Sequence, residues 1–182
     1  LYTPREDALY INIYAGNSME VPVENGTLRL RVSGNYPWQE QVTIAVESPQ
    51  PVRHTLALRL PDWCTQPQII LNGEEVEQDI RKGYLHITRE WQEGDMLNLT
   101  LPMPVRRVYG NPLVRHVAGK VAIQRGPLVY CLEQADNGES LHNLWLPTDA
   151  PFTTFEGKGL FSHKILIQAP GYRYEQSNPE QQ

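Results

Sequence analysis

The sequence lacks the features of several common functional classes. Lysine and arginine number 16 against 21 aspartates and glutamates, which gives a net charge of −5 and a pI near 5.5. Nucleic-acid and membrane-surface binders need clustered positive charge, so we expect neither kind of partner. An apolar run of about 18 residues, the minimum for a membrane-spanning helix, does not occur.

Cysteine is scarce, with only Cys64 and Cys131, far apart in the sequence. One disulfide is arithmetically possible, but two separate thiols are the favoured interpretation, because no other sign of secretion is present. Each cysteine lies beside an aromatic residue, which favours buried apolar positions over a zinc site. A secretory signal is not recognisable, so cytoplasm is the favoured compartment. Because the sequence begins with Leu1 rather than methionine, we interpret it as part of a longer polypeptide.

Motifs for common catalytic chemistry are also missing. The sequence has no Gly-x-Ser-x-Gly nucleophile turn and no glycine-rich phosphate loop. The five histidines form no local pair at metal-ligand spacing, so we interpret them as surface or satisfied imidazoles. Two of them, His54 and His86, fall at positions of predicted strands that we expect to face outward. Carboxylates lie mostly in turns, and the sequence cannot show the facing pair that a glycosidase needs.

What the sequence does contain is alternation of apolar and polar residues, which is typical of half-buried strands. Leu28, Leu30 and Val32 alternate with arginines and a serine, and similar segments recur about every ten residues. Two Asn-Gly pairs, at Asn25 and Asn72, predict tight hairpin turns. The segments predicted as strands in this way are 8–14, 19–23, 28–33, 41–47, 54–60, 69–71, 84–87 and 96–101.

Short strands separated by Gly, Pro and Asn indicate an all-β fold with little helix. We predict two β-sandwich, jelly-roll-like units of antiparallel strands over residues 1–105 and 106–182. Residues 1–7 are expected to be a connection from a preceding domain, and residues from about 176 a polar tail. The two Asn-x-Thr sequons, Asn25-Gly-Thr27 and Asn98-Leu-Thr100, are interpreted as coincidental.

The segment from Val121 to Glu133 holds two apolar runs on either side of Arg125-Gly126-Pro127. Glycine and proline restrict the backbone there to a turn, so the segment predicts two strands or one sharply bent strand. Both runs are apolar enough to be buried on two faces.

Aromatic residues are the candidate carbohydrate contacts. Tyr36, Trp38, Trp63 and Trp145 fall in predicted loops or at strand ends, where a planar ring can stack on a sugar. The alternative interpretation, which we favour, is that such rings cap the open ends of a sandwich core.

Three motifs carry a resemblance to a known family. They are the 121–133 segment, Leu58-Arg59-Leu60-Pro61-Asp62-Trp63-Cys64, and Leu101-Pro102-Met103-Pro104-Val105-Arg106. Together with residues 7–14 and 33–38, they resemble the C-terminal part of glycoside hydrolase family 127, the β-L-arabinofuranosidase-like enzymes. The likeness runs from Leu1 to about Glu133 and continues more weakly beyond.

The resemblance implies a catalytic (α/α)6 barrel that precedes these β-sandwich domains. It also implies zinc in that barrel, bound to a nucleophilic cysteine of a Cys-Cys pair, to a glutamate and to further cysteines. This sequence has no Cys-Cys pair, and Cys64 and Cys131 match scaffold motifs. We therefore assign no catalytic, cofactor or metal residue to this chain.

We expect a non-catalytic portion of a glycoside hydrolase that braces the barrel and shapes its substrate cleft, and we expect the isolated chain to be inactive. Two alternatives remain open. One is a carbohydrate-binding module that holds an oligosaccharide on its loop aromatics. The other is a structural domain that forms oligomers through a sheet edge.

Overall fold

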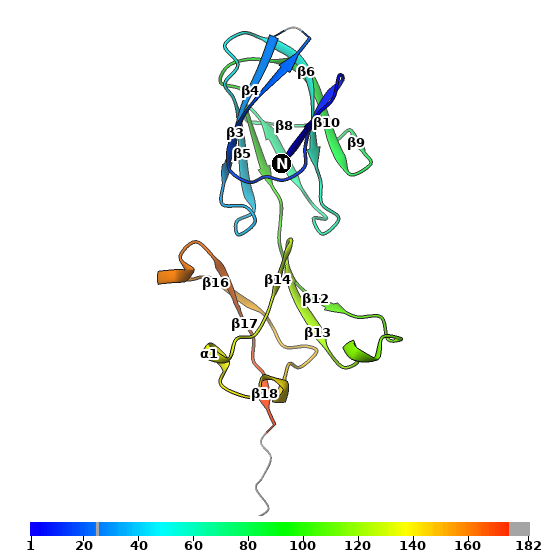
Figure 1. Ribbon diagram of the computed structural model, residues 1–182, viewed down its shortest axis with the longest axis vertical. Coiled ribbons are helices and arrows are strands. Elements are labelled where there is room, and N and C mark those ends of the chain that lie inside the picture. Colours follow the sequence, from blue (N-terminus) through cyan, green and yellow to red (C-terminus); the bar gives the residue numbers. More distant parts are fainter. Residues whose placement is uncertain (25, 175–182) are drawn as a thin grey trace, which may run out of the picture. The chain divides into compact units, whose positions relative to one another are not determined.

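The computed structural model describes residues 1–24 and 26–174. The chain divides into two compact units, with unit 1 over Leu1–Pro104 and unit 2 from Val105 onward. Strands dominate both units, which confirms the all-β fold (Figure 1). The predicted polar tail from residue 176 lies outside the described residues, as does Asn25 of the first Asn-Gly turn and sequon.

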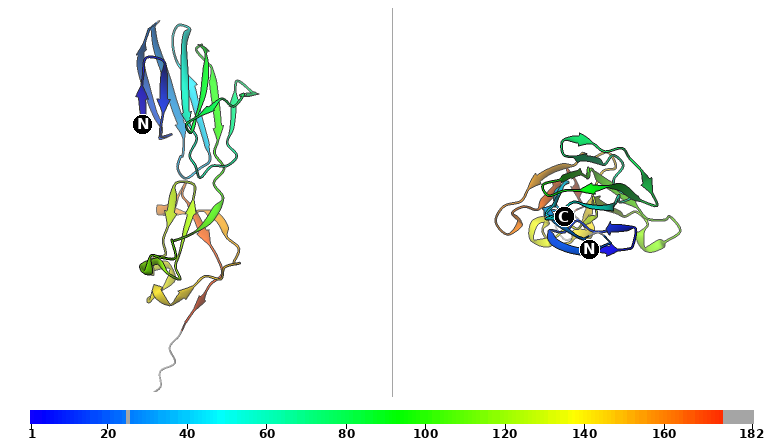
Figure 2. Two further views of the ribbon diagram at one scale, coloured as in Figure 1. Left: turned by 90° about the vertical axis from the view of Figure 1, so that its right-hand side faces the viewer. Right: turned by 90° about the horizontal axis from the view of Figure 1, so that it is seen from above.

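Unit 1 consists of two sheets that share one core. The first has the strand order β1-β2-β6-β10-β9, with β2 and β6 parallel and its other neighbours antiparallel. The second is antiparallel, in the order β3-β4-β5-β11-β7-β8. Figure 2 shows these strands in two further orientations. The bounds are β1 (Tyr2–Pro4), β2 (Ala8–Ile11), β3 (Asn17–Val23), β4 (Gly26–Gly34), β5 (Gln41–Val46), β6 (Val52–Arg59), β7 (Gln68–Leu71), β8 (Glu74–Glu75), β9 (Ile80–Arg81), β10 (Tyr84–Trp91) and β11 (Met96–Thr100).

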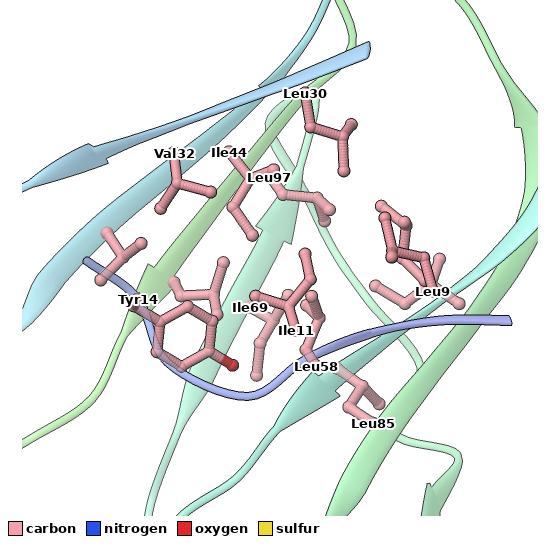
Figure 3. Close-up of a cluster of buried hydrophobic side chains, with 14 of the residues drawn as sticks. Leu9, Ile11, Tyr14, Leu30, Val32, Ile44, Leu58, Ile69, Leu85 and Leu97 are labelled. Carbon is pink, nitrogen blue, oxygen red and sulfur yellow. The ribbon is translucent and has the colours of Figure 1, made fainter. Parts of the chain in front are cut away.

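The core of unit 1 follows the alternation of the sequence. In β4, Leu28, Leu30 and Val32 are buried while Arg29 and Arg31 are exposed, as predicted. Figure 3 shows side chains of both sheets pointing into the same interior. Full burial of one such side chain stabilises a fold by about 1.5–3 kcal/mol, so this core is the main source of stability of unit 1.

The alternation predicted for residues 8–14 is wrong after Ile11. Leu9 and Ile11 are buried, but Ile13 is 50% exposed and the ring of Tyr14 is buried. The N–H groups of Asn12 and Ile13 both donate to the carbonyl oxygen of Leu1, at 2.8 and 3.1 Å. When two residues of one strand lie opposite a single residue of the neighbouring strand, they form a β-bulge. The extra residue shifts the alternation, so the side chains after the bulge point to the opposite side from the one predicted.

Two further predictions for unit 1 need correction. Residues Tyr2–Pro4, expected in a plain connection, form β1 and pair with β2. His54 is buried rather than outward-facing, because it lies on the same side of β6 as Val52 and Leu56, which face the core. The predicted turn at Asn72-Gly73 is confirmed, since both residues have positive φ and join β7 to β8.

Unit 2 carries its strands in three small antiparallel sheets. One has the order β12-β13-β14, and the others are the pairs β15-β18 and β16-β17. The strand bounds are β12 (Val105–Tyr109), β13 (Val121–Arg125), β14 (Leu128–Tyr130), β15 (Leu144–Trp145), β16 (Thr153–Glu156), β17 (Ile165–Gln168) and β18 (Tyr172–Arg173). The helical turns are η1 (Arg115–Val117), α1 (Gln134–Asn137), η2 (Leu141–Asn143) and η3 (Gly159–Phe161).

The segment 121–133 forms two strands, β13 and β14, joined at Gly126 and Pro127, where Gly126 has φ 56°. The prediction that both runs are buried on two faces is wrong, because Val129 is 71% and Leu132 55% exposed. Among the described residues of unit 2, Ala150 is the only buried hydrophobic residue. Unit 2 therefore lacks the kind of core that unit 1 has.

Arg107 on β12 holds part of unit 2 together in place of a large core. Its Nη2 donates to the carbonyl oxygens of Pro147 and Ala150, and its guanidinium lies 4.3 Å from the ring centroid of Phe152. The hydroxyl of Tyr130 on β14 likewise donates to the carbonyl oxygen of Ile165, at 2.9 Å. Side-chain hydrogen bonds thus join the β12-β13-β14 sheet to the segment 147–150 and to β17.

None of the described helices has the length and apolar character needed to cross a membrane.

Candidate functional site

Two of the predicted carbohydrate contacts, Tyr36 and Trp63, each lie against the core of unit 1. Both are partly buried and pack on the same cluster, which also includes Tyr14 and Cys64. The rings of Tyr14 and Tyr36 meet edge to face, with centroids 5.8 Å apart. This packing is the arrangement that core-capping rings would adopt, and it leaves only part of each ring exposed for a ligand.

The tyrosines of this cluster are in an environment that opposes ionisation. Burial is the largest cause of the raised pKa of Tyr14, and the neighbouring Tyr36 adds to it. Burial also raises the pKa of Tyr36, with a further contribution from Cys64 nearby. Tyr14 donates a 2.7 Å hydrogen bond to the carbonyl oxygen of Arg59, so its hydroxyl is a structural donor. Neither hydroxyl is suited to act as a base near neutral pH.

Trp38 lies in the same loop as Tyr36 and is half-buried. Its backbone N–H donates to the carbonyl oxygen of Asn35 at 2.8 Å, and so does that of Gln39, at 3.0 Å. The loop therefore has a fixed backbone, and Trp38 remains a predicted carbohydrate contact.

Trp145 differs from the other predicted contacts because its ring is open to solvent. It is 66% exposed, and Tyr172, opposite it in the β15-β18 pair, is 64% exposed. The two ring centroids are 6.1 Å apart with an interplanar angle of 36°. Gly171 lets the strands approach closely, because a Cβ there would lie 3.1 Å from the carbonyl oxygen of Trp145. The strand pair thus presents two neighbouring rings.

A shallow hollow lies in the segment that leads to β15. It is lined by Gln134, Glu139, Ser140, Leu141 and His142. Arg173 of β18 donates to the carbonyl oxygens of Asn137 and Glu139, which fastens this segment to the β15-β18 pair.

Sequence reasoning missed a network on the outer face of the five-stranded sheet. Tyr84 donates to Oδ1 of Asn12 at 2.8 Å, and Nδ2 of Asn12 donates to the hydroxyl of Thr3 at 3.1 Å. The rings of Tyr10 and Tyr84 meet edge to face at 5.1 Å. Arg59 lies over the ring of Tyr84. The only sequence signal is aromatic residues at outward positions of strands far apart in sequence, whose pairing the sequence does not reveal.

The histidines and cysteines do not assemble into a metal site. Within residues 1–24 and 26–174, no group of three or more His, Cys, Asp or Glu side chains is close enough to hold a metal ion. Neither cysteine forms a disulfide, in agreement with the interpretation as separate thiols. Cys64 is buried as expected, but Cys131 is exposed, which corrects the expectation of burial. These residues do not fit the zinc site that the resemblance places in the barrel.

Asp95 is the buried carboxylate of unit 1, and its contacts are structural. It accepts hydrogen bonds from Nδ2 of Asn72 at 2.7 Å and from the N–H of Gln92 at 2.9 Å, and Arg89 lies 3.6 Å away. A carboxylate held in this way stabilises the turn before β11. A catalytic acid, in contrast, would need to be open to the substrate.

Comparison with known families gives two matches that together span most of the chain. The model described as the middle domain of family GH127, β-L-arabinofuranosidase, matches residues 8–103. The model described as the glycoside hydrolase family 127 C-terminal domain matches residues 105–176.

Known proteins show the same similarity. A non-reducing end β-L-arabinofuranosidase of Bifidobacterium longum subsp. longum is 32% identical over 120 residues, which are 64% of this chain and 18% of the relative. A GH127 β-L-arabinofuranosidase of Geobacillus stearothermophilus T6 has a similar structure, with TM-score 0.88 and 38% identity over 98% of this chain. A GH127 β-arabinofuranosidase gives TM-score 0.83 and 27% identity over 93% of this chain. This chain covers only 29% and 32% of those two solved chains.

Proposed function

The chain belongs to glycoside hydrolase family 127, as its middle and C-terminal domains, and from this premise we propose that it is the non-catalytic supporting part of a β-L-arabinofuranosidase-like enzyme. It braces a catalytic (α/α)6 barrel in the same polypeptide and shapes the mouth of the substrate cleft. The zinc and its cysteine and glutamate ligands belong to that barrel.

The observation that carries this proposal is the contrast between the two units. Unit 1 has a closed apolar core, whereas unit 2 leaves many large apolar side chains exposed. Extensive apolar exposure on an ordered domain is typical of a surface that another domain covers. The chain also spans less than a third of the length of the solved relatives. The remaining length is enough for a further domain.

Truncation of the full-length polypeptide that contains this chain tests the proposal. We expect removal of residues 1–182 to lower the melting temperature of the remaining part and to reduce kcat for an aryl β-L-arabinofuranoside. A truncated enzyme with unchanged kcat and an unchanged melting temperature would contradict the bracing role.

A second candidate function is favoured by the exposed Trp145–Tyr172 pair. Two solvent-exposed rings on a hydrogen-bonded strand pair can stack the apolar faces of sugar units in an oligosaccharide. Affinity electrophoresis in gels containing plant arabinan or arabinogalactan tests it. Retardation that is lost in Trp145→Ala and kept in Tyr2→Ala, which changes an exposed ring of unit 1, supports binding. Unretarded migration of the unaltered chain excludes it.

A further inference from the structure

The connection between β12 and β13 projects from unit 2 and is exposed throughout. Residues 108–120, which we call the arm, are all exposed, and Figure 1 shows this connection in green, extending away from the other strands of unit 2. The arm nevertheless contains large apolar side chains. Leu113 is 90% exposed and Tyr109 61%, and Val108, Val114 and Val117 add to the same apolar surface.

The arm is an ordered structure. The N–H of Val114 donates to the carbonyl oxygen of Asn111 at 2.9 Å, and Lys120 donates to that of Val117 at 3.0 Å. Gly110 allows Val117 to pack at its base, because a Cβ at position 110 would lie 2.4 Å from Cγ2 of Val117. The backbone that carries the apolar side chains is therefore held in place before any partner arrives, which lowers the entropic cost of docking.

The charge of the arm sets it apart from the rest of the chain. Between Pro104 and Glu133 there is no aspartate or glutamate, although the whole chain has a net charge of −5. Arg115 and Lys120 lie in the arm itself, and His116 adds a third basic group. An exposed surface that is both apolar and positive is complementary to an apolar surface bordered by carboxylates.

We propose that the arm docks into an apolar groove bordered by carboxylates on the catalytic barrel of the same polypeptide. This inference rests on the proposed function, because it names the surface through which unit 2 braces the barrel. A barrel is the favoured occupant because the solved relatives are about three times as long as this chain, which covers 29–32% of them. A further domain of the same polypeptide is therefore available to cover the arm.

Hydrogen–deuterium exchange of the 182-residue chain and of the full-length polypeptide provides the direct test. We expect amides of residues 113–118 to exchange about tenfold or more slowly in the full-length polypeptide, because docking must open before they exchange. Unchanged exchange in the arm, with other surfaces of units 1 and 2 protected, would overturn the arm as the docking surface but leave the proposed bracing role intact. Unchanged exchange everywhere would overturn the bracing role itself.

Two variants of the full-length polypeptide sharpen the test. Leu113→Asp places a carboxylate in the docked apolar surface, and we expect it to abolish the protection of the arm. Ile80→Asp is the matched control, because Ile80 is an isolated exposed residue on β9, 48% exposed and flanked by the ion pair of Asp79 and Arg81. Protection that survives Leu113→Asp, or that Ile80→Asp removes equally, would overturn the assignment.

Protein concentration separates the barrel from a second copy of the chain. Docking within one polypeptide gives the same protection at every concentration, which is the expected result. Protection that appears only as the concentration rises would assign the arm to an interface between copies and overturn the barrel as its occupant.

Discussion

The hydroxyl of Tyr14 donates a 2.7 Å hydrogen bond to the backbone carbonyl oxygen of Arg59, 45 residues away in sequence. The bond ties the segment after β2 to the end of β6 at the edge of the core. It forms because the bulge at Asn12 and Ile13 turns Tyr14 inward. Removing this hydrogen bond therefore tests how much it contributes to the stability of unit 1.

We expect Tyr14→Phe to lower the free energy of unfolding of the chain by about 0.5–1.5 kcal/mol, because the carbonyl of Arg59 loses its donor in a partly buried place. Urea denaturation followed by circular dichroism measures this change. Tyr2→Phe, at an exposed ring on β1, serves as the control and is expected to change stability little. Equal stability of Tyr14→Phe and the unaltered chain would show that the bond contributes nothing.

The dependence of stability on alkaline pH provides a second test of Tyr14. The pKa of Tyr14 is raised by burial above its usual value near 10. Its contribution to stability is fully present below that pH and is lost as the pH rises further, because the unfolded state then ionises first. We expect the stability of unit 1 to fall above pH about 10, and to fall less steeply in Tyr14→Phe. Identical pH profiles for the two proteins would contradict this.

The fold was predictable from the sequence where periodicity alone decides it. The alternation of Leu28, Leu30 and Val32 placed β4 and its buried face correctly, because each strand residue alternates sides regardless of its partner. The inward turn of Tyr14 was not predictable, since it depends on a bulge against Leu1. The burial of Val129 was overestimated because an apolar run does not reveal whether another surface covers it.

The candidate site residues were also only partly predictable from the sequence. Tyr36, Trp38, Trp63 and Trp145 could be named as aromatic candidates, but residue type does not say which ring is open, and the structure leaves Trp145 the most exposed. The Trp145–Tyr172 pair required the pairing of β15 with β18, two short strands separated by residues 146–171. Long-range pairing of this kind has no local signal.

His54 makes stability sensitive to acid. Burial lowers its pKa below the usual value near 6.5, although the negative charge of Asp7 opposes this. Its contribution to stability is therefore present above pH about 6.5 and is lost as the pH falls, because the unfolded state takes up the proton more readily. We expect His54→Gln to flatten the loss of stability between pH 7 and pH 5 (roughly the range in which His titrates), and the exposed His142→Gln to leave it unchanged. The same slope in all three proteins would contradict the assignment.

Gly34 and Gly16 provide a matched pair of glycines in unit 1. A Cβ at Gly34 would lie 2.6 Å from the carbonyl oxygen of Gln41, and its φ of 132° is rarely adopted by other residues. At Gly16 the nearest atom would be 3.8 Å away. We expect Gly34→Ala to destabilise by about 1–3 kcal/mol and Gly16→Ala to be nearly neutral in urea denaturation. Equal effects would show that close approach at Gly34 is unimportant.

Arg107 is expected to be the residue that unit 2 tolerates losing least. Lysine has one charged head in place of the planar fork, so Arg107→Lys should lose part of the contact with Pro147, Ala150 and Phe152. We expect the free energy of unfolding of unit 2 to fall by about 1.5–3 kcal/mol. This loss should be visible as faster amide exchange in unit 2 and not in unit 1. Arg106→Lys is the control on the neighbouring position of β12. Unchanged exchange in Arg107→Lys would remove Arg107 from this role.

The central claim is that this chain supports a glycosidase and does not itself break glycosidic bonds. Its most direct test is release of the aryl group from an aryl β-L-arabinofuranoside by the purified 182-residue chain, with and without added zinc, beside the full-length polypeptide. The account predicts release by the full-length polypeptide and none above buffer by the chain in either condition. Turnover by the isolated chain would contradict it.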